Sequence, residues 1–396
     1  MKSSEKMNAA NVYFRLNDFS VIEFLIASSG ILLLAYALLI FYYHKIWESI
    51  PETDHELTAQ PMSISVIIPA RNEAARIKNC LQSIFNQSYP AALTNILVVN
   101  DFSTDETAAL VMEYGDKCRL LNLSDYVPDP VNSYKKKAIE TGIAHSSAEL
   151  IICTDADCTM ERDWIQSLVS AYQMANVVFI AAPVKIVPDG SALSIFQALD
   201  FIALQGITGA AVYKNLYPMC NGANLAYSRK AFETVGGFAG IDHIASGDDM
   251  LLLKKIQKSF PGRCSYLKDP RVIVSTRSAS GIRAFFNQRI RWASKISHYK
   301  HPATFLTLAL VYVLNFLLLL LFITCFLYGH WKWLLLLIVC KTISEYFFVS
   351  KVAGFFGQQS LMKYFILCQP FHIVYTVIAG SFGSFGRYEW KNRKVK

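Results

Sequence analysis

The stretch SISVIIPARNEAARIKNCLQSIFNQ, Ser63–Gln87, joins a short β-branched run to a segment with helical periodicity. The run Ser63–Ala70 is almost wholly apolar, which predicts a buried strand. In the segment that follows, apolar residues recur on one face of a helix, at Ile77, Leu81, Ile84 and Phe85. The stretch therefore predicts a strand followed by a helix that packs on the sheet.

The same alternation of strand and helix continues along the chain. Further apolar runs predict strands at Asn95–Asp101, Glu149–Asp157 and Val177–Val184. Between them, Ser103 and Glu106 fit a capping box that opens a helix, and KKKAIETGIAHS predicts another helix. Strands that are apolar throughout, separated by helices, are typical of a mostly parallel sheet covered on both faces. The predicted fold class of this part is α/β.

Four long apolar segments predict α-helical transmembrane elements, because about 20 apolar residues cross a bilayer. They are Val21–Tyr43, Ala303–Tyr328, Trp331–Val349 and roughly Leu361–Phe382. The last contains Gln369 and Pro370, so a re-entrant hairpin is an alternative to a full span. Trp331 and Trp333 are expected to be anchors at the membrane interface. A further apolar helix, SALSIFQALDFIALQGITGAA, is expected either at the interface, lining an acceptor channel, or in a buried core.

The composition supports a membrane protein with one soluble domain. Hydrophobic residues make up 53% of the chain and charged residues 17%. The predicted organisation is an N-terminal segment (1–20), an anchor (21–43), a cytosolic domain (44–302), C-terminal membrane segments (303–382) and a basic tail (383–396). The nine cysteines show no CxxC pair, which favours a reducing compartment without disulfides or a zinc site.

The positive charge is unevenly distributed along the chain. Between Lys254 and Lys300 there are twelve lysines and arginines and a single acidic residue, Asp269. We interpret this stretch as a face that is attracted to anionic lipid headgroups. Nucleic acid is excluded as a partner because no aromatic and basic binding module is present.

Carboxylates follow the ends of two predicted strands. Asp101 ends one strand, and Asp155 and Asp157 follow the next in TDAD. Ligands of open α/β sheets bind outside the carboxyl ends of the strands. Two carboxylates at i and i+2 repel one another unless a cation lies between them. Mg²⁺ or Mn²⁺, completed by substrate phosphates, would satisfy the pair, whereas the alternative is an ordinary surface turn.

Two later motifs add charged groups. Asp248 and Asp249 precede an apolar helix, where N-capping explains one aspartate more easily than two. In FNQRIRWASKI, Gln288, Arg291 and Trp292 share one helical face at i, i+3 and i+4, next to a membrane segment. That face would meet an anionic or sugar-like ligand close to the bilayer.

Taken in order, these motifs resemble membrane-bound family 2 glycosyltransferases with the GT-A nucleotide-sugar fold. The motifs are VIIPARNEA, VVNDFSTD, KAIETGIAHSSAELIICTDAD, NGANLAYSRKAFETVGGF, SGDD and QRIRW, over roughly residues 63–295. The last is similar to the QxxRW signature of cellulose, chitin and hyaluronan synthases and of ceramide glucosyltransferases. Two positions depart from the family pattern. Asn100-Asp101 stands where Asp-Asp is usual, and Gly247-Asp248-Asp249 stands where Glu-Asp or Thr-Glu-Asp is usual, which leaves Asp249 as the match to the catalytic base.

The resemblance implies a hexosyltransferase and a role for each matching residue. Pro69, Arg71 and Glu73 would line the nucleotide pocket, Asp101 would bind uracil and Lys137 the diphosphate. Asp155 and Asp157 would hold Mg²⁺ or Mn²⁺. Asp249, beside Asp248, would be the base of an inverting displacement, Arg291 would stabilise the departing UDP, and Gln288 and Trp292 would line the acceptor side.

The expected function is transfer of a sugar from a UDP-sugar to a membrane lipid, with the alternative of a processive polysaccharide synthase that uses the same site. Three or four membrane segments offer little polar lining for a polymer pore, which favours the lipid acceptor. A transporter or scaffold is disfavoured because the segments show no inverted repeat. The expected location is the cell (inner) membrane, multi-pass, with a cytosolic catalytic domain and a cytosolic tail.

Overall fold

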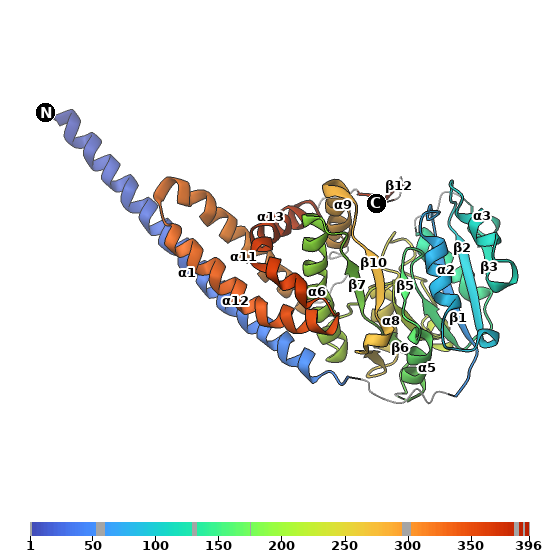
Figure 1. Cartoon of the computed structure of the whole chain (residues 1–396). Helices are drawn as coiled ribbons and strands as arrows, with labels where there is room; N and C mark the ends of the chain where they lie inside the picture. Colours follow the sequence, from blue (N-terminus) through green and yellow to red (C-terminus); the bar gives the residue numbers. More distant parts are fainter. Residues whose placement is uncertain are drawn as a thin grey trace.

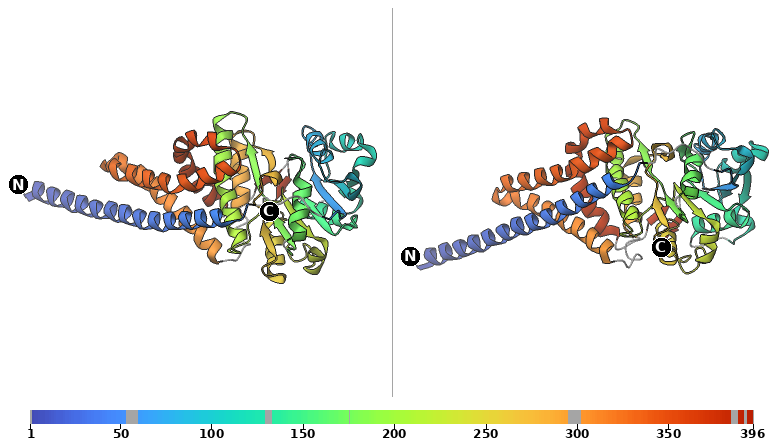
Figure 2. Two further views of the ribbon diagram at one scale, coloured as in Figure 1. Left: turned by 60° about the horizontal axis from the view of Figure 1, so that its bottom comes forward. Right: turned by 90° about the horizontal axis from the view of Figure 1, so that it is seen from below.

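The computed structural model describes residues 2–52, 60–128, 133–174, 176–294, 302–383, 388–390 and 393–395, with side chains between residues 21 and 383. A sheet with its helices lies at one end of the molecule and a bundle of long apolar helices at the other (Figure 1). Two other directions of view show the same separation (Figure 2).

The main sheet has seven strands in the order β3-β2-β1-β4-β8-β6-β9. They are β1 (Ile64–Ala70), β2 (Thr94–Asn100), β3 (Arg119–Asn122), β4 (Leu150–Cys153), β6 (Phe179–Ala181), β8 (Leu225–Ser228) and β9 (Cys264–Tyr266). All neighbouring strands are parallel except β8, which is antiparallel to both β4 and β6. The predicted α/β fold with a mostly parallel sheet is confirmed.

The sheet is covered on both faces. Alternate residues of β1 belong to different apolar clusters, with Ile67 on one side and Val66 and Ile68 on the other. Ile139 packs on the Ile67 side, and Leu81 on the opposite side. The helices of this part are α2 (Ile77–Phe85), α3 (Thr107–Met112), α4 (Tyr134–Ala144), α5 (Trp164–Met174), α7 (Arg229–Thr234) and α8 (Met250–Ser259). Short 3₁₀ turns are η1 (Ala91–Leu93), η2 (Gly115–Lys117), η3 (Leu123–Asp125) and η4 (Pro270–Val272).

Two details of the sequence prediction are wrong. The single strand expected at Val177–Val184 is interrupted at Pro183, which has no N–H for a sheet ladder, and its two parts join different sheets. The second part is β7 (Val184–Val187), which forms a small sheet with β5 (Thr159–Met160) and β10 (Val274–Arg277). The capping box is also absent, since α3 begins only at Thr107, whose N–H donates to Asp105 Oδ1 at 3.0 Å.

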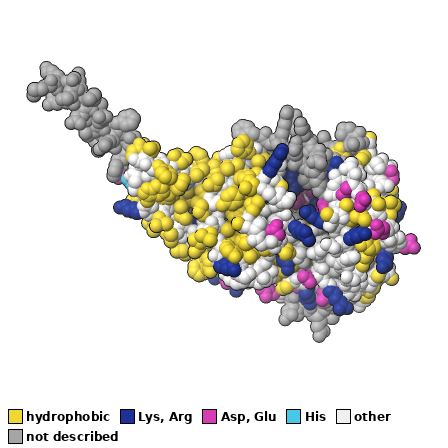
Figure 3. All heavy atoms as spheres, turned by 45° about the horizontal axis from the view of Figure 1, so that its top comes forward, with side chains coloured by type: hydrophobic (Ala, Val, Ile, Leu, Met, Phe, Trp, Pro, Cys, Tyr) yellow, Lys and Arg dark blue, Asp and Glu magenta, His cyan; other side chains and the backbone are white. Residues whose placement is uncertain are grey.

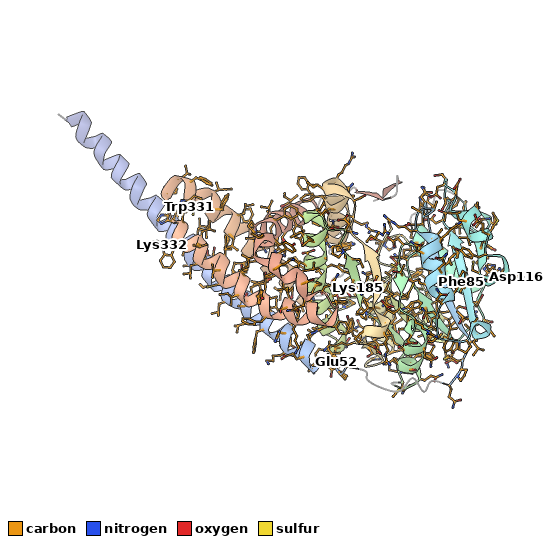
Figure 4. All side chains as sticks on the ribbon, viewed as in Figure 1. Glu52, Phe85, Asp116, Lys185, Trp331 and Lys332 are labelled. Carbon is orange, nitrogen blue, oxygen red and sulfur yellow. The ribbon has the colours of Figure 1, made fainter. Side chains whose placement is uncertain are left out.

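Five helical segments are long and apolar enough to cross a membrane in the described part of the chain. They lie in α1 (Lys2–Ser49), α6 (Ala192–Tyr213), α11 (Pro302–Tyr328), α12 (Trp331–Phe355) and η5 with α13 (Gln359–Tyr364 and Phe365–Gly383). In the face shown by Figure 3, a broad apolar surface covers this bundle, and charged side chains gather on the sheet domain. Trp331 and Lys332 lie at the tip of the α11–α12 hairpin, at the end opposite the sheet (Figure 4).

Helix α6 belongs to both parts of the molecule. It packs against α1 and α12 on the membrane side and against β7 and β9 on the sheet side. A Cβ on Gly206 would lie 2.6 Å from Phe348 of α12, and one on Gly209 would lie 2.7 Å from Trp47 of α1. Small residues let helices approach closely. The sequence left an interfacial helix and a buried core helix open for this segment, and its packing is that of a buried helix. Its Asp200 and Phe201 also line a cavity.

The last apolar segment does not extend to the far end of the bundle. At its start, Gln358 Nε2 donates to the carbonyl of Ile186 in β7 at 2.7 Å. In its middle, Gln369 contacts Lys341 and Glu345, near the middle of α12. At its end, Gly383 packs directly against Ala293, which belongs to α9 (Gly281–Ser294), and leaves no room for a Cβ. Both ends therefore lie on the side of the sheet domain, as in the re-entrant alternative. A short hairpin, β11 (Tyr388–Trp390) and β12 (Arg393–Val395), follows.

The basic stretch from Lys254 does not form one face. Lys268 is 3% exposed, and its Nζ donates to the carbonyl of Trp47. Arg271 forms an ion pair with Asp269 at 2.7 Å. Arg289 is also buried, and Lys295 and Lys300 lie outside the described residues. Lys268 and Arg289 therefore do not belong to the predicted lipid-attracting face, and attraction of the remaining cations to headgroups stays a prediction.

Candidate active site

The loops after β1, β2 and β4 meet at one edge of the sheet. The parallel register pairs Ala70 with Asn100 and Ile67 with Cys153, so the three strands end side by side. Their following residues line one cavity of about 1400 Å³. Of the predicted site residues, the cavity is lined by Pro69, Arg71, Glu73, Asp101, Asp155, Asp157, Asp248, Asp249, Gln288, Arg291 and Trp292.

The first two loops hold one another in place. Arg71 Nη1 donates to the carbonyls of Asp101 at 2.9 Å and Phe102 at 2.8 Å. Asn72 and Phe102 both have a φ of 50°, and the N–H of Asn72 donates to Ser103 Oγ. Asn100 connects β2 to β3, because its side-chain amide donates to Asn122 Oδ1 at 3.0 Å. This explains why only the second residue of Asn100-Asp101 lines the cavity.

A lysine lies among the acidic residues of the cavity. Lys135 Nζ is 2.7 Å from Asp155 Oδ1 and 3.1 Å from Asp248 Oδ2. Burial opposes the charge of Lys135, but Asp155 and Asp248 raise its pKa well above the usual value. The side chain is therefore a cation at neutral pH. It joins the TDAD motif after β4 to the SGDD motif before α8.

Lys137, which the sequence suggested for the diphosphate, lies elsewhere. Its Nζ is 2.8 Å from Glu140 on the same helix, and it is not among the residues that line the cavity. Lys136 is buried, and its Nζ donates to the carbonyls of Ile241 and Ile244. Successive helical residues are about 100° apart, so the three lysines of α4 point in three directions. Lys135 is the one directed into the cavity.

Asp249 has a structural contact as well as a place in the cavity. It is the N-cap of α8, and its Oδ1 accepts from the N–H of Met250 at 2.7 Å. Gly247, two residues earlier, has a φ of 84°, which favours glycine. Asp248 and Asp249 are 8% and 9% exposed. The capping hydrogen bond holds the carboxylate of Asp249, and the ion pair with Lys135 holds that of Asp248. Both carboxylates are therefore fixed at the cavity wall.

The α9 helix closes the other side of the cavity. Its Trp292 lies 6.1 Å from the ring of Phe201 in α6, measured between centroids. The Oε1 atom of Gln288 is buried and has no hydrogen-bond partner in the described structure. The predicted shared face of Gln288, Arg291 and Trp292 is thus directed at the cavity that the acidic residues also line.

A model of Glycosyl transferase family 2 matches residues 65–236. Residues 65–236 are a family 2 glycosyltransferase domain. The match covers β1 to α7, including the loops with Asp101, Asp155 and Asp157. It confirms the family predicted from the motifs for this part of the chain.

Two proteins named as glycosyltransferases are similar to parts of this chain. The chain is 25% identical over 261 residues to "Probable glycosyltransferase YdaM" of Bacillus subtilis, covering 64% of this chain and 59% of that protein. It is 35% identical over 128 residues to "4,4'-diaponeurosporenoate glycosyltransferase" of Staphylococcus aureus, covering 30% of this chain and 32% of that protein. The chain thus matches less than two thirds of the length of either relative.

A solved structure shares the architecture beyond the glycosyltransferase domain. The mannosyltransferase PcManGT from Pyrobaculum calidifontis matches with a TM-score of 0.58 and 19% identity. The alignment covers 89% of this chain and 99% of that one. At this identity the match shows the fold, and it confirms the predicted GT-A-like arrangement.

The cavity continues from the glycosyltransferase domain into the bundle of long apolar helices. Past Trp292 it is lined by side chains of α1, α6, α11, α12 and α13, among them Tyr36, Phe201, Phe305, Phe348 and Phe365. Most of this lining is apolar. Thus one continuous space connects the acidic residues at the sheet edge with the interior of the helical bundle.

Two cysteines beside the acidic residues, Cys80 and Cys158, are buried thiols. Burial raises the pKa of Cys80, and the neighbouring Asp157 and Asp155 raise it further. Burial likewise raises the pKa of Cys158 well above its usual value. Both are neutral thiols at physiological pH, whereas the thiolate is the nucleophile and metal ligand.

Sequence reasoning missed several residues of the site. A Cβ on Gly222 would lie 2.8 Å from Asp248 Oδ2 and 2.9 Å from Lys135 Nζ. This glycine lets the loop NGAN reach the ion pair. Arg76, at the start of α2, lies 3.5 Å from Asp157 Oδ2. Arg76 and Gly222 lie in the stretches RNEAAR and NGAN, which overlap the family-like motifs. Neither stretch has a residue spacing that by itself indicates a ligand.

Proposed function

We propose that this protein transfers a sugar from a nucleoside diphosphate sugar, expected to be a UDP-sugar, to a lipid held among its membrane helices. The observation that carries the proposal is the single cavity shared by the acidic cluster and the apolar bundle. A water-soluble donor requires the polar end, and a lipid requires the apolar end. The names of the relatives, both glycosyltransferases, support the reaction class.

In this proposal the donor lies at the carboxyl ends of β1, β2 and β4. Asp101 would bind the base, and Arg71 would keep the two loops around it in position. Lys135 replaces Lys137 as the cation for the diphosphate, since it lies in the cavity and remains charged. Arg291 would stabilise the negative charge of the departing nucleotide, which is usually the largest contribution to catalysis.

The acceptor hydroxyl would approach from the Trp292 side. Asp249 would take its proton as the oxygen attacks the anomeric carbon, while the bond from that carbon to the diphosphate breaks. Because the attack comes from the opposite face, the configuration inverts and no protein nucleophile is needed. The neutral Cys80 and Cys158 agree with a direct displacement.

The residues fit a hard divalent cation that the diphosphate completes. In the described residues no group of three or more His, Cys, Asp and Glu side chains could hold a metal alone. Asp155 and Asp157 offer carboxylate oxygens, which Mg²⁺ and Mn²⁺ prefer, together with substrate phosphates. When bound, the ion would neutralise charge on the diphosphate. The Pyrobaculum mannosyltransferase was solved with GDP-Man and Mn²⁺, which supports the same donor class.

The acceptor class is tested by product extraction. Membranes that contain the protein are incubated with labelled UDP-sugars and GDP-mannose, then extracted with organic solvent. We expect label in the lipid fraction as a product with one sugar. Label in a high-mass, water-soluble or insoluble polymer would instead support the processive synthase. The Asp249→Asn variant must lose whichever product is formed.

The two lysines of α4 provide a matched test of the donor site. Lys135→Gln should lower kcat/KM for the nucleotide sugar by at least about tenfold, because a charge-assisted contact to phosphate is lost. Lys137→Gln, two residues away and paired with Glu140 on the helix surface, should stay within about twofold of wild type. Equal effects of the two substitutions would contradict the assignment of Lys135.

The location and tail are proposed from the ends of the last segment. We place the sheet domain in the cytosol and the protein in the cell membrane, with α1 and the α11–α12 hairpin crossing it. Since Gln358 and Gly383 both contact the domain side, a reporter fused after Lys396 should be cytosolic. Fluorescence of a fused GFP, which fails to fold after export, measures this. An alkaline phosphatase fusion that is active in the periplasm would contradict it.

A further inference from the structure

A buried arginine lines the membrane part of the cavity. Arg289 of α9 is 4% exposed, and its guanidinium carbon lies 5.1 Å from the ring centroid of Phe285 and 4.3 Å from that of Trp292. Its Nη2 atom is 2.8 Å from Asp200 Oδ2 of α6, which is 7% exposed. The pair thus joins α9 to α6 beside the residue proposed to receive the acceptor.

This pair has hydrogen-bonding capacity that the described protein does not use. The contact to Asp200 lacks hydrogen-bond geometry, and Nε, Nη1 and Nη2 of Arg289 have no acceptor in the described structure. Asp200 Oδ1 accepts from Tyr375 of α13, and His372 Nε2 lies 3.9 Å from the same oxygen. The Nδ1 atom of His372 is also buried without a partner among the described residues. Buried polar groups normally have partners, so donors directed into a cavity indicate a ligand.

The charges of the cluster indicate which kind of ligand fits. Arg289 and Asp200 offset one another, so the cluster carries no net charge when His372 is neutral. The neighbouring Lys341 and Glu345, which are 2.6 Å apart, also offset one another. An added anion would leave an uncompensated charge in a largely apolar space, which is costly. An uncharged oxygen would accept from Arg289 without that cost.

We propose that the Arg289–Asp200 cluster binds an uncharged carbonyl or hydroxyl group of the acceptor lipid and so selects neutral lipids over lipid phosphates. The inference rests on the proposed function, since it specifies the acceptor for the same cavity. His372 and Tyr375 hold the carboxylate of Asp200 and are positioning residues. Arg289 supplies the donors.

The test compares two lipids with the same acyl chains. The full-length protein in detergent is titrated with dioleoylglycerol and with dioleoyl phosphatidic acid, each labelled at the end of one chain, in excess unlabelled phosphatidylglycerol. We expect dioleoylglycerol to bind at least about tenfold more tightly, which corresponds to about 1.4 kcal/mol. UDP binding is measured on the same preparation.

A charge-balanced variant keeps the test independent of misfolding. Asp200→Leu combined with Arg289→Met removes the cluster without leaving one buried charge alone. In this variant the preference should fall to within about twofold, while UDP binding is retained. Lys332→Gln, at the far tip of the hairpin, should keep the full preference.

Each other outcome has a definite meaning. Equal or tighter binding of phosphatidic acid, or binding of neither lipid, by protein that binds UDP would overturn the inference and leave the donor site standing. A preference that survives in the double variant would also overturn it. A preparation that prefers dioleoylglycerol and does not bind UDP or another nucleotide sugar would contradict the proposed function.

Discussion

Replacing Asp249 by asparagine is expected to lower turnover at least about 10²-fold, the usual scale for removal of a general base. The amide cannot accept the proton of the acceptor hydroxyl, so the attacking oxygen stays protonated. Asparagine is as good an N-cap as aspartate, so the hydrogen bond to Met250 and the start of α8 should persist. The substitution therefore separates chemistry from stability at this residue.

The measurement is kcat with saturating donor, together with the Kd of UDP. The Kd should change little because Asp249 is assigned to the acceptor side. Asp242→Asn, an exposed residue of the same loop, is the matched control and should behave as wild type. Near-normal turnover of Asp249→Asn would move the base to Asp248 or to another residue.

Removal of divalent metal is expected to abolish transfer altogether. Asp155 and Asp157 lie at the same strand end, and Lys135 is the only cation within ion-pairing distance of Asp155 in the described structure. A diphosphate brought next to these carboxylates needs further positive charge to be stable. Excess EDTA should stop product formation, and added Mg²⁺ or Mn²⁺ should restore it.

A binding readout complements the activity. With UDP present, Mn²⁺ should bind wild-type protein, and Asp157→Asn should weaken that binding by at least about tenfold, because loss of even an outer-shell partner of a metal ligand costs about 10- to 100-fold in affinity. Asp116→Asn, at the remote edge of the domain, is the control (Figure 4). Full activity in excess chelator would show that Lys135 and Arg291 suffice for the diphosphate.

Local sequence patterns predicted much of the sheet and the membrane helices. Apolar runs predicted β1, β2 and β4, because a strand buried on both faces has a distinctive composition. The predicted ends of β1 and β2 lie within one or two residues of the observed ends. The break at Pro183 and the antiparallel β8 depend on which strands become neighbours. Such pairing is a tertiary property, and the sequence between Val177 and Ser228 does not display it.

In the candidate site, motifs located the loops better than the atoms. TDAD, SGDD and QRIRW all line the cavity, as their order suggested. The choice between Lys135 and Lys137 depended on the start of α4, since a shift of two residues turns a helix by about 200°. The Asp200–Arg289 pair joins positions that are 89 residues apart. In the sequence, Asp200 is a polar residue in an apolar helix and Arg289 is one of many cations, so neither residue indicates the other.

The close contacts of α6 also constrain how the protein is made. During translation, residues 192–213 leave the ribosome well before Phe348 and Val352 of α12, against which Gly206 packs. Until then this apolar helix has no cover on that side, although the strands before it have already been synthesised. On that side, the packing of α6 can therefore be completed only after α12 has been synthesised. Because α6 also contacts β7 and β9, the junction between the sheet domain and the helical bundle is completed late in synthesis.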